Sequence, residues 1–440
     1  MRLILLLYNL ALWLLLPFGV AYFLFRRFAT GRGSAPLAPR LGLRLPPAPP
    51  AGAAPLWLHA VSVGEVLVMA PLVEEILRRV PGTAIYLSTV TPTGQATAIR
   101  TFGDRVRVFY CPFDLTAPVG RVLRRIRPRH LIIAETELWP SLLSRAHREG
   151  VPVSVVNGRI SDRSLPRYMR VRALLRPFLA LPERFLMQSE EDAGRIRRMG
   201  APPERVAVTG NMKFDAVRHI QPNAALAGAI TSLWGVPEPR VLLCGSTMEG
   251  EEEILAGIFS RLRPRHPDLR LLVAPRRPER FDRVAEVFTQ RGLAVFRRSR
   301  LGQETPAGPV ETVILDSLGE LASLYPLAEA VFIGGTLVPT GGHNVLEPAA
   351  AGRAILVGPS MENFREIADL FVRAGALLQA RDAAEFEVLL ERLLDDPDER
   401  KAAGARAAEL LHARQGATAR NVERIFGPAA AGQEAAEAPR

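Results

Sequence analysis

Two residue types are scarce in this chain of 440 residues. It has two cysteines, Cys111 and Cys244, which lie far apart with no cysteine or histidine at ligand spacing around them. A disulfide framework and a zinc site are therefore not expected, and a reducing compartment fits. Lysine occurs only at Lys213 and Lys401, so arginine carries nearly all the positive charge behind the net charge of +11.

The excess of arginine has two interpretations. An arginine guanidinium binds phosphate at two points, so the charge suits a phosphate-bearing ligand, an anionic membrane surface or nucleic acid. A bias in codon usage is the simpler interpretation, and the total charge by itself favours it. The chain is 48% apolar and too long for one core, so it is expected to form two domains.

The N-terminus carries a long uncharged apolar run, residues 3–25. A helix of this length can cross a hydrocarbon core of about 30 Å, so we expect residues 1–32 to be a membrane anchor with a basic flank. The arginines that follow the run, Arg26, Arg27 and Arg32, predict that the body of the protein lies on the cytoplasmic side of the membrane.

Polar and ring residues within this run leave a second arrangement open, a helix lying in the membrane interface. They are Tyr8, Asn9, Trp13 and Pro17. Residues 33–55 are rich in proline, alanine and glycine and are expected to be a linker, with Arg40 and Arg44 available to lipid phosphates.

From residue 56 onward, strand and helix patterns alternate, which predicts parallel sheets covered by helices on both faces. The expected strands are 56–61, 83–89, 105–111, 130–135, 151–156, 184–188 and 205–209, and then 240–245, 270–274, 293–297, 312–315, 330–333 and 354–357. The expected helices include 66–79, 119–126, 138–148, 384–394 and 399–425.

The predicted fold class is therefore α/β, with two doubly wound Rossmann-like domains facing a cleft. The predicted divisions are a first domain at 56–210, a linker at 211–238, a second domain at 239–426 and a disordered tail at 427–440. Ligands of such sheets bind at the carboxyl ends of the strands.

The motif Ser62-Val-Gly-Glu65 lies at the end of the first expected strand. Ser-x-x-Glu before an apolar helix is the pattern of a capping box, in which the glutamate bonds back to the start of the helix. A carboxylate at the tip of a strand is also well placed to act as a general base. The motif by itself favours the cap.

A glycine-rich run, residues 334–348, follows an apolar strand and leads into a helix through the pattern Asn344-x-x-Glu347. Helix N-termini bind phosphate through free N–H groups and the helix dipole, so this run is a candidate nucleotide site in which Glu347 accepts a hydrogen bond from a ribose hydroxyl or the base. A plain loop before a capped helix is the alternative.

Other charged residues also follow expected strands. Arg276 and Arg277 are candidate phosphate clamps, and Glu135 and Glu137 are two carboxylates of which one is expected to face the cleft. Lys213 is either a point charge for a ligand or a solvated surface lysine. No metal site is expected, since His343 has no partner at ligand spacing and the Asp-Pro-Asp sequence at 396–398 lies in a charged turn.

Together these motifs resemble the bacterial 3-deoxy-D-manno-octulosonic acid (Kdo) transferases that act on lipid A. The matching segments are 59–65, 91–94, 135–140, 209–215, 246–252, 275–281 and 334–347. The chain departs from the family's usual residues at Gly158, Met248 and Arg277, of which the last two stand where histidine is common.

The resemblance implies a glycosyltransferase-B fold and transfer of Kdo from CMP-Kdo to a lipid A precursor at the inner membrane. It implies Glu65 as the general base and Glu135 and Lys213 as groups that stabilise the transition state. The positions it assigns to CMP binding are Pro275, Arg276, Leu318, Gly319, Glu320, Asn344, Val345, Leu346 and Glu347. Inversion is expected, without a metal, a cofactor or a nucleic-acid partner.

Three alternatives remain open at this point. Another membrane-surface transferase of the same fold would use a UDP-sugar, and a sugar-nucleotide epimerase would share the architecture. A membrane-tethered nucleotide-binding module would have no catalysis at all.

Overall fold

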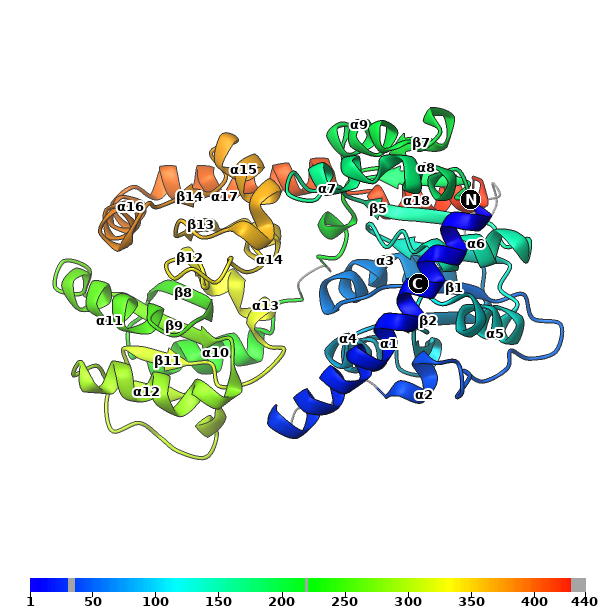
Figure 1. Cartoon of the computed structure of the whole chain (residues 1–440). Helices are drawn as coiled ribbons and strands as arrows, with labels where there is room; N and C mark the ends of the chain where they lie inside the picture. Colours follow the sequence, from blue (N-terminus) through cyan, green and yellow to red (C-terminus); the bar gives the residue numbers. More distant parts are fainter. Residues whose placement is uncertain (31–35, 218–220, 429–440) are drawn as a thin grey trace, which may run out of the picture. The chain divides into compact units, whose positions relative to one another are not determined.

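The structure is a computed structural model that describes residues 1–30, 36–217 and 221–428, without the side chains of 22–30 (Figure 1). The chain forms two compact units. Unit 1 comprises Met1–Ala216 and Arg414–Arg440, and unit 2 comprises Val217–Ala413. Each is a parallel α/β unit.

Unit 1 contains a parallel sheet in the order β3-β2-β1-β4-β5-β6-β7. Its strands are β1 (Leu56–His59), β2 (Ile85–Thr89), β3 (Arg107–Tyr110), β4 (His130–Ala134), β5 (Val153–Gly158), β6 (Arg184–Met187) and β7 (Val206–Val208). Its helices are α1 (Arg2–Thr30), α2 (Leu37–Arg40), α3 (Val63–Arg79), α4 (Pro92–Phe102), α5 (Thr116–Ile126), α6 (Pro140–Arg148), α7 (Leu165–Arg170), α8 (Arg172–Leu179), α9 (Glu190–Met199) and α18 (Ala417–Phe426).

Unit 2 contains a second parallel sheet in the order β10-β11-β9-β8-β12-β13-β14. Its strands are β8 (Arg240–Thr247), β9 (Leu269–Pro275), β10 (Val295–Arg297), β11 (Thr312–Ile314), β12 (Ala330–Ile333), β13 (Ala354–Val357) and β14 (Leu378–Gln379). Its helices are α10 (Ala224–Leu233), α11 (Glu251–Leu262), α12 (Phe281–Gln290), α13 (Leu321–Leu324), α14 (Leu346–Ala350), α15 (Arg365–Arg373), α16 (Ala383–Asp395) and α17 (Pro397–Arg414), whose last residue lies in unit 1.

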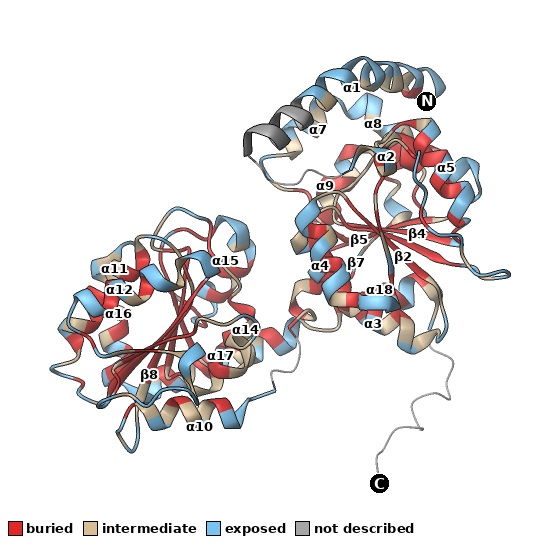
Figure 2. Ribbon diagram, turned by 90° about the horizontal axis from the view of Figure 1, so that it is seen from below, coloured by how far each residue is buried: buried red, intermediate tan, exposed pale blue. Residues whose placement is uncertain are grey.

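The central strands are buried on both faces, as Figure 2 shows by their red colour. Strand β1, for example, consists entirely of buried residues, because helices cover both sides of the sheet. In unit 1 the strand order reverses direction between β1 and β4, and in unit 2 it reverses between β8 and β12. Ligands of doubly wound sheets bind at such reversals, at the carboxyl ends of the strands.

The fold prediction is confirmed: both parallel sheets are present, and every expected strand occurs within a few residues of its expected bounds. The structure adds the short strand β14. Helix α1 is long and apolar enough to cross a membrane over Arg2–Ala21, with a mean hydropathy of 2.2, although a signal sequence meets the same test.

The segment 33–55, expected to be a linker, is folded onto unit 1 where the structure describes it. From residue 36 it packs on that unit and includes α2. Tyr86 donates to the carbonyl oxygen of Pro47, and Arg107 donates to that of Ala48. Arg40 is buried rather than available at the surface. Arg32 and most of the expected tail, 429–440, lie outside the described residues.

The expected final helix 399–425 is broken into two. Gly416, with a φ of +88°, separates α17 from α18. Helix α18 was expected to belong to the second domain, but it packs against α3 of unit 1 and buries Ala417, Val422 and Ile425 in the core there. The boundary between the units falls at residues 216 and 217, inside the expected linker 211–238.

Candidate functional site

Glu65 lies in the first turn of α3, at the carboxyl end of β1. Its carboxylate accepts hydrogen bonds from the backbone N–H of Val61 at 2.8 Å and from the hydroxyl of Ser62 at 2.8 Å. The Ser62 hydroxyl in turn accepts a bond from the Glu65 amide at 3.5 Å. Ser62 therefore caps α3 as the Ser-x-x-Glu pattern favoured, but the Glu65 carboxylate bonds back to the N–H of Val61, one residue before the N-cap, in place of the N-cap N–H of a standard capping box.

The same carboxyl group is in an unusual electrostatic position. It is 8% exposed, and burial raises its pKa to about 7 against the two hydrogen bonds, which lower it. The nearby carboxylates of Glu135 and Glu137 raise the pKa further by like-charge repulsion. Three acidic side chains thus gather where the strand order reverses, and Glu65 titrates in the range that suits a general base.

Glu135 follows β4 and has a left-handed backbone, with a φ of +52°. Two other non-glycine residues share this conformation at strand ends: Asn157 in β5, with a φ of +53°, and Ser246 in β8, with a φ of +58°. Such backbone costs about 1–3 kcal/mol per residue and is concentrated at functional sites. The strained residues therefore mark the same sheet edges as the sequence motifs.

Glu137 and two aromatic rings complete this edge of unit 1. The indole Nε1 of Trp139 donates to Glu137 at 2.7 Å, and the Trp139 ring meets the ring of His59 edge-on at 4.7 Å between centroids. His59 is fully buried, which lowers its pKa to about 4, so it is neutral at physiological pH. No separate role was predicted for His59, although it begins the matching segment that ends at Glu65.

Lys213 lies in the short helical turn η3 (Met212–Phe214), which is tied to the same sheet. The Asn157 side-chain oxygen accepts a hydrogen bond from the Met212 N–H at 2.8 Å, and Asp215 accepts bonds from two amides at the start of α18. The structure thus places Lys213 on the same unit as Glu65 and Glu135, next to the end of β5.

In unit 2 the predicted nucleotide residues lie along one sheet edge. Pro275 ends β9, and Arg276 follows it, while the loop containing Leu318, Gly319 and Glu320 comes after the neighbouring β11. The glycine-rich run follows β12. The charge of Arg276 lowers the pKa values of His343 and Glu347, although burial is the largest effect on both. Arg276 is therefore close to the Asn344–Glu347 group.

Asn344 bonds to the start of α14, but the N-cap residue of that helix is Val345, which makes no side-chain cap bond. The Asn344 side-chain oxygen accepts a bond from the Leu346 N–H at 3.1 Å, and its amide group donates to Glu347 at 3.2 Å. The positive φ values of Gly341 and Gly342, +91° and +75°, require glycine. Burial raises the pKa of Glu347. Val345 and Leu346 are buried.

Among the positions predicted to bind CMP, Glu320 is already paired within the protein and Leu318 is exposed. Glu320 is held in a two-point ion pair with Arg298, which lowers its pKa, while Leu318 is 72% exposed. Arg276 and Arg277 are both exposed, and neither side chain has an ion pair with any described residue. Arg276 is thus a cation that a phosphate group can approach.

The structure reveals one buried carboxylate beside the glycine-rich run to which the sequence-based predictions assigned no separate role. Glu251, at the start of α11, accepts hydrogen bonds from the N–H groups of Gly335, Thr336 and Leu337 at 2.7, 2.9 and 3.0 Å and from Met248 at 2.9 Å. The first amides of the glycine-rich run are therefore occupied by a protein carboxylate. An acidic triplet after Gly250 was the available signal, but it indicates only a helix start.

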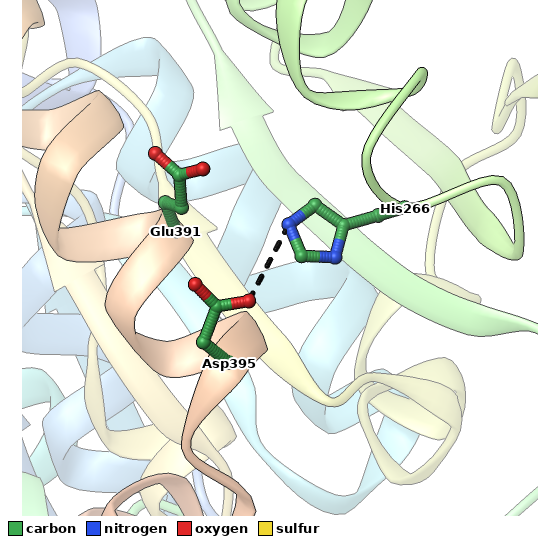
Figure 3. A group of neighbouring side chains, drawn as sticks. All are labelled: His266, Glu391 and Asp395. Carbon is green, nitrogen blue, oxygen red and sulfur yellow. Dashed lines mark ion pairs between the residues drawn. The ribbon is translucent and has the colours of Figure 1, made fainter.

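A second acidic group in unit 2 joins His266, Glu391 and Asp395, whose ligand atoms lie within 4.8 Å of one another (Figure 3). Arg240 donates to Nδ1 of His266 at 3.3 Å, and Nε2 of the same ring lies 3.7 Å from Asp395. Glu391 pairs with Arg265. This arrangement fits an ion-pair network better than a metal site.

Comparisons with known proteins agree with these observations. A family model described as 3-deoxy-D-manno-octulosonic-acid transferase (kdotransferase) matches residues 35–216. The chain is 34% identical to a 3-deoxy-D-manno-octulosonic acid transferase of Haemophilus influenzae over 376 residues, which is 84% of this chain and 86% of the relative. It is 35% identical to the Bordetella pertussis enzyme of the same name over 387 residues, 86% and 88% of the two chains.

Among solved structures, a UDP-GlcNAc 2-epimerase from Neisseria meningitidis matches with a TM-score of 0.52 and 13% identity, over 82% of this chain and 98% of the other. At that identity the likeness shows the fold, which is of the glycosyltransferase-B type. The curated relatives, by contrast, are similar over most of both sequences. The chain therefore belongs to the bacterial Kdo transferase family, glycosyltransferases that transfer Kdo in lipopolysaccharide biosynthesis.

Proposed function

We propose that this enzyme transfers Kdo from CMP-Kdo to a lipid A precursor with inversion, and that Glu65 is the general base. The observation that carries the proposal is the Glu65 carboxyl group, which is buried where the strand order of unit 1 reverses and has a pKa raised to about 7. Such a group is half ionised near neutral pH and accepts a proton readily there.

In the proposed reaction, an acceptor hydroxyl gives its proton to the Glu65 carboxylate. The acceptor oxygen attacks the anomeric carbon of Kdo, and the bond to CMP breaks with its electron pair going to the phosphate oxygen. Glu65 must leave its bonds to Val61 and Ser62 for this step. That movement costs little if the acceptor hydroxyl replaces one of the two donors.

Negative charge develops on the departing phosphate, and we assign its stabilisation to Arg276, with Asn344 and Glu347 holding the rest of CMP. Arg276 is exposed and close to the glycine-rich run, whereas the first amides of that run already bind Glu251. A donor that meets the developing charge contributes about 3–4 kcal/mol of transition-state stabilisation. Glu135 and Lys213 are assigned supporting roles near the reacting sugar.

Helix α1 is proposed to hold the enzyme at the inner membrane, lying in the interface. Tyr8 donates to Asp114 at 2.9 Å, and Asn9 bonds to Ser141 and Thr116 of unit 1. The first turns are therefore docked on the protein, while a set of large apolar side chains remains exposed for a bilayer. These are Leu3, Leu6, Leu7, Leu10, Trp13, Leu14, Leu15 and Phe18.

A product assay tests the proposal. The purified enzyme is incubated with CMP-Kdo and a tetra-acylated lipid A precursor, and the lipid is analysed by mass spectrometry. We expect the mass of the precursor to increase by one or more Kdo residues. Transfer from a UDP-sugar with no use of CMP-Kdo would instead support another transferase of the same fold, and CMP binding without transfer would support a binding module.

A further inference from the structure

An apolar pocket of about 310 Å³ lies between α1 and the body of unit 1. One wall is formed by α1, including Leu12, Leu16 and Gly19, and the other by residues that follow strands β2, β3 and β4. We propose that this pocket binds one acyl chain of the lipid acceptor. The inference rests on the proposed function, since it assigns part of the substrate of the same site.

The wall supplied by α1 is fixed in place by specific contacts. Leu5 is 4% exposed and belongs to the core of unit 1, and α1 lies beside α6 (Figure 1). The Asn9 side-chain oxygen accepts bonds from the N–H and hydroxyl of Thr116 at 2.8 and 3.0 Å, and its amide donates to Ser141 at 3.0 Å. Asn9, a polar residue in an apolar helix, therefore fixes α1 against unit 1, and the pocket between them has a fixed wall on each side.

Arg40 and Asp114 are the charged residues that line this largely apolar pocket, and Asp114 already accepts hydrogen bonds from Tyr8 and from the N–H groups of Ser141 and Leu142. Arg40 is 7% exposed, and its Nε has no hydrogen-bond partner within the part of the chain that the structure describes. One terminal nitrogen donates to the Val90 carbonyl, and the guanidinium lies 5.3 Å from the Phe113 ring. No carboxylate among the described residues pairs with it. A buried donor of this kind requires an acceptor.

An acyl group supplies both parts of this chemistry. A methylene is similar in size to a water molecule, which takes about 30 Å³ of liquid, so the pocket holds on the order of ten methylenes. The carbonyl oxygen at the head of the chain accepts a hydrogen bond from the Arg40 guanidinium. A sugar would leave its hydroxyl groups against the apolar walls without partners.

The position of the pocket favours the acceptor over a bilayer lipid. Trp139 lines the pocket and also contacts His59 and donates to Glu137, one of the carboxylates that raise the pKa of Glu65. A chain in the pocket therefore lies next to the residues that surround Glu65. The acceptor of the proposed reaction brings its sugar to Glu65, so one of its chains extends into this pocket.

The test fills the pocket with Gly19→Phe. A Cβ at Gly19 meets no heavy atom within 4 Å, and glycine is a poor helix former, so the variant is expected to fold. The matched control is Ala11→Phe, which adds the same ring to an exposed position of α1 that does not line the pocket. Thermal unfolding of both variants is compared with the wild type.

Kinetics are measured in detergent with a tetra-acylated acceptor and with the same disaccharide carrying four-carbon chains. We expect Gly19→Phe to raise the KM of the long-chain acceptor about tenfold or more, because several methylenes lose their burial, and to leave the short-chain acceptor unchanged. Ala11→Phe should match the wild type with both. Equal losses on both acceptors, or no loss on either, would overturn the proposal.

Two further measurements distinguish the acceptor from a bilayer lipid and this proposal from the proposed function. A defect of Gly19→Phe that appears in phospholipid vesicles and is absent in detergent would mean that the pocket holds a bilayer lipid, which contradicts the proposal. If the wild type transfers no Kdo, the proposed function fails, and the pocket is judged by equilibrium binding of the tetra-acylated lipid without donor. Weaker binding by Gly19→Phe than by Ala11→Phe then supports it, and equal binding refutes it.

Discussion

Burial controls the chemistry of the individual carboxylates at the sheet edge of unit 1. Burial raises the pKa of Glu65 by more than its two hydrogen bonds lower it, and repulsion from Glu135 and Glu137 raises it further, so the pKa is about 7. The bonds to Val61 and Ser62 belong to a helix cap, but a cap alone does not require a carboxyl group that is protonated half of the time near neutrality. This combination is the reason for assigning Glu65 a chemical role.

Replacing Glu65 by glutamine tests that role directly. Glutamine is isosteric but cannot accept a proton, so Glu65→Gln should lower kcat by about 10²–10⁴-fold. For the wild type, the base must be ionised, so kcat/KM should fall below a pH of about 7. Single-turnover rates across pH 5–9 would show both effects. A fully active variant would leave Glu65 as a cap and nothing more.

The same substitution has an opposite effect on stability. Because the pKa of Glu65 is raised, the folded protein binds the Glu65 proton more tightly than the unfolded chain does. The tighter binding stabilises the folded state fully below about pH 4.5, and this contribution is lost as the pH rises through about 7. By pH 8 the ionised group disfavours the folded state by about 3 kcal/mol. The free energy of unfolding of Glu65→Gln, minus that of the wild type, should therefore be larger at pH 8 than at pH 5.

Denaturant unfolding at the two pH values measures this difference. The pKa of Asp114 is also raised, to about 6, so the wild type alone would not isolate Glu65. The comparison of Glu65→Gln with the wild type cancels the contribution of Asp114. A difference between the two proteins that stays constant from pH 5 to pH 8 would contradict the raised pKa.

Arg276 and Arg277 form a matched pair for the nucleotide site. Both are exposed, but the charge of Arg276 acts on His343 and Glu347, whereas Arg277 precedes the turn η4 (Pro278–Arg280). We expect Arg276→Gln to lower kcat/KM about 10²–10³-fold and Arg277→Gln to change it less than about threefold. Titration with CMP should show the same order. Equal losses would mean that the total charge matters, not the position of Arg276.

At the scale of elements, the glycine-rich run after β12 is held by hydrogen bonds to α11, the helix that follows β8. The four backbone donors bound by Glu251 come from two loops, one after β8 and one after β12. The two loops lie this close together because Gly334 has no side chain: a Cβ there would lie 2.4 Å from the carbonyl oxygen of Ser246. The loop that carries Asn344 is therefore shaped by Glu251 before any ligand binds.

Glu251→Gln should disturb this loop. The glutamine amide nitrogen cannot accept hydrogen bonds, so two of the four N–H groups lose their partner, at a cost of roughly 3 kcal/mol to unit 2. CMP should bind more weakly, since the run that carries Asn344 and Glu347 is no longer held. Glu249→Gln, at a position in the same acidic stretch that lies outside these hydrogen bonds, is the control. Calorimetry and CMP titration would refute the assignment if the two variants behaved alike.

The sequence predicted local elements well and their long-range partners poorly. The strands were predicted because they are continuous apolar runs, and Ser62-x-x-Glu65 and Asn344-x-x-Glu347 were predicted as caps because each pattern is complete within four residues. The bonds from residues 335–337 to Glu251 join positions more than eighty residues apart, and no local pattern records them. Arg40 was misassigned for the same reason, since its burial depends on the distant Val90 and Phe113.

At the scale of the whole molecule, the chain leaves unit 1 after Ala216 and returns to it at Arg414. The returning helix α18 could not be assigned from the sequence, because its apolar stripe fits a core in either unit. In the structure, Val422 and Ile425 join the core of unit 1 beside α3, and Asp215 accepts bonds from the N–H groups of Gly416 and Thr418 at 2.7 and 2.6 Å. The end of the chain thus stabilises the loop that carries Lys213.

Truncation after Arg414 should therefore act on unit 1. It removes two buried aliphatic side chains, Ala417 and both bonds to Asp215, so the loss is on the order of 5 kcal/mol. Truncation after Pro428, which keeps α18, is the control. Calorimetry should show a lower unfolding temperature for unit 1 and little change for unit 2, together with reduced turnover because Lys213 is displaced. Since CMP contacts are assigned to unit 2, CMP affinity should persist in the shorter chain, and its loss would mean that α18 supports both units.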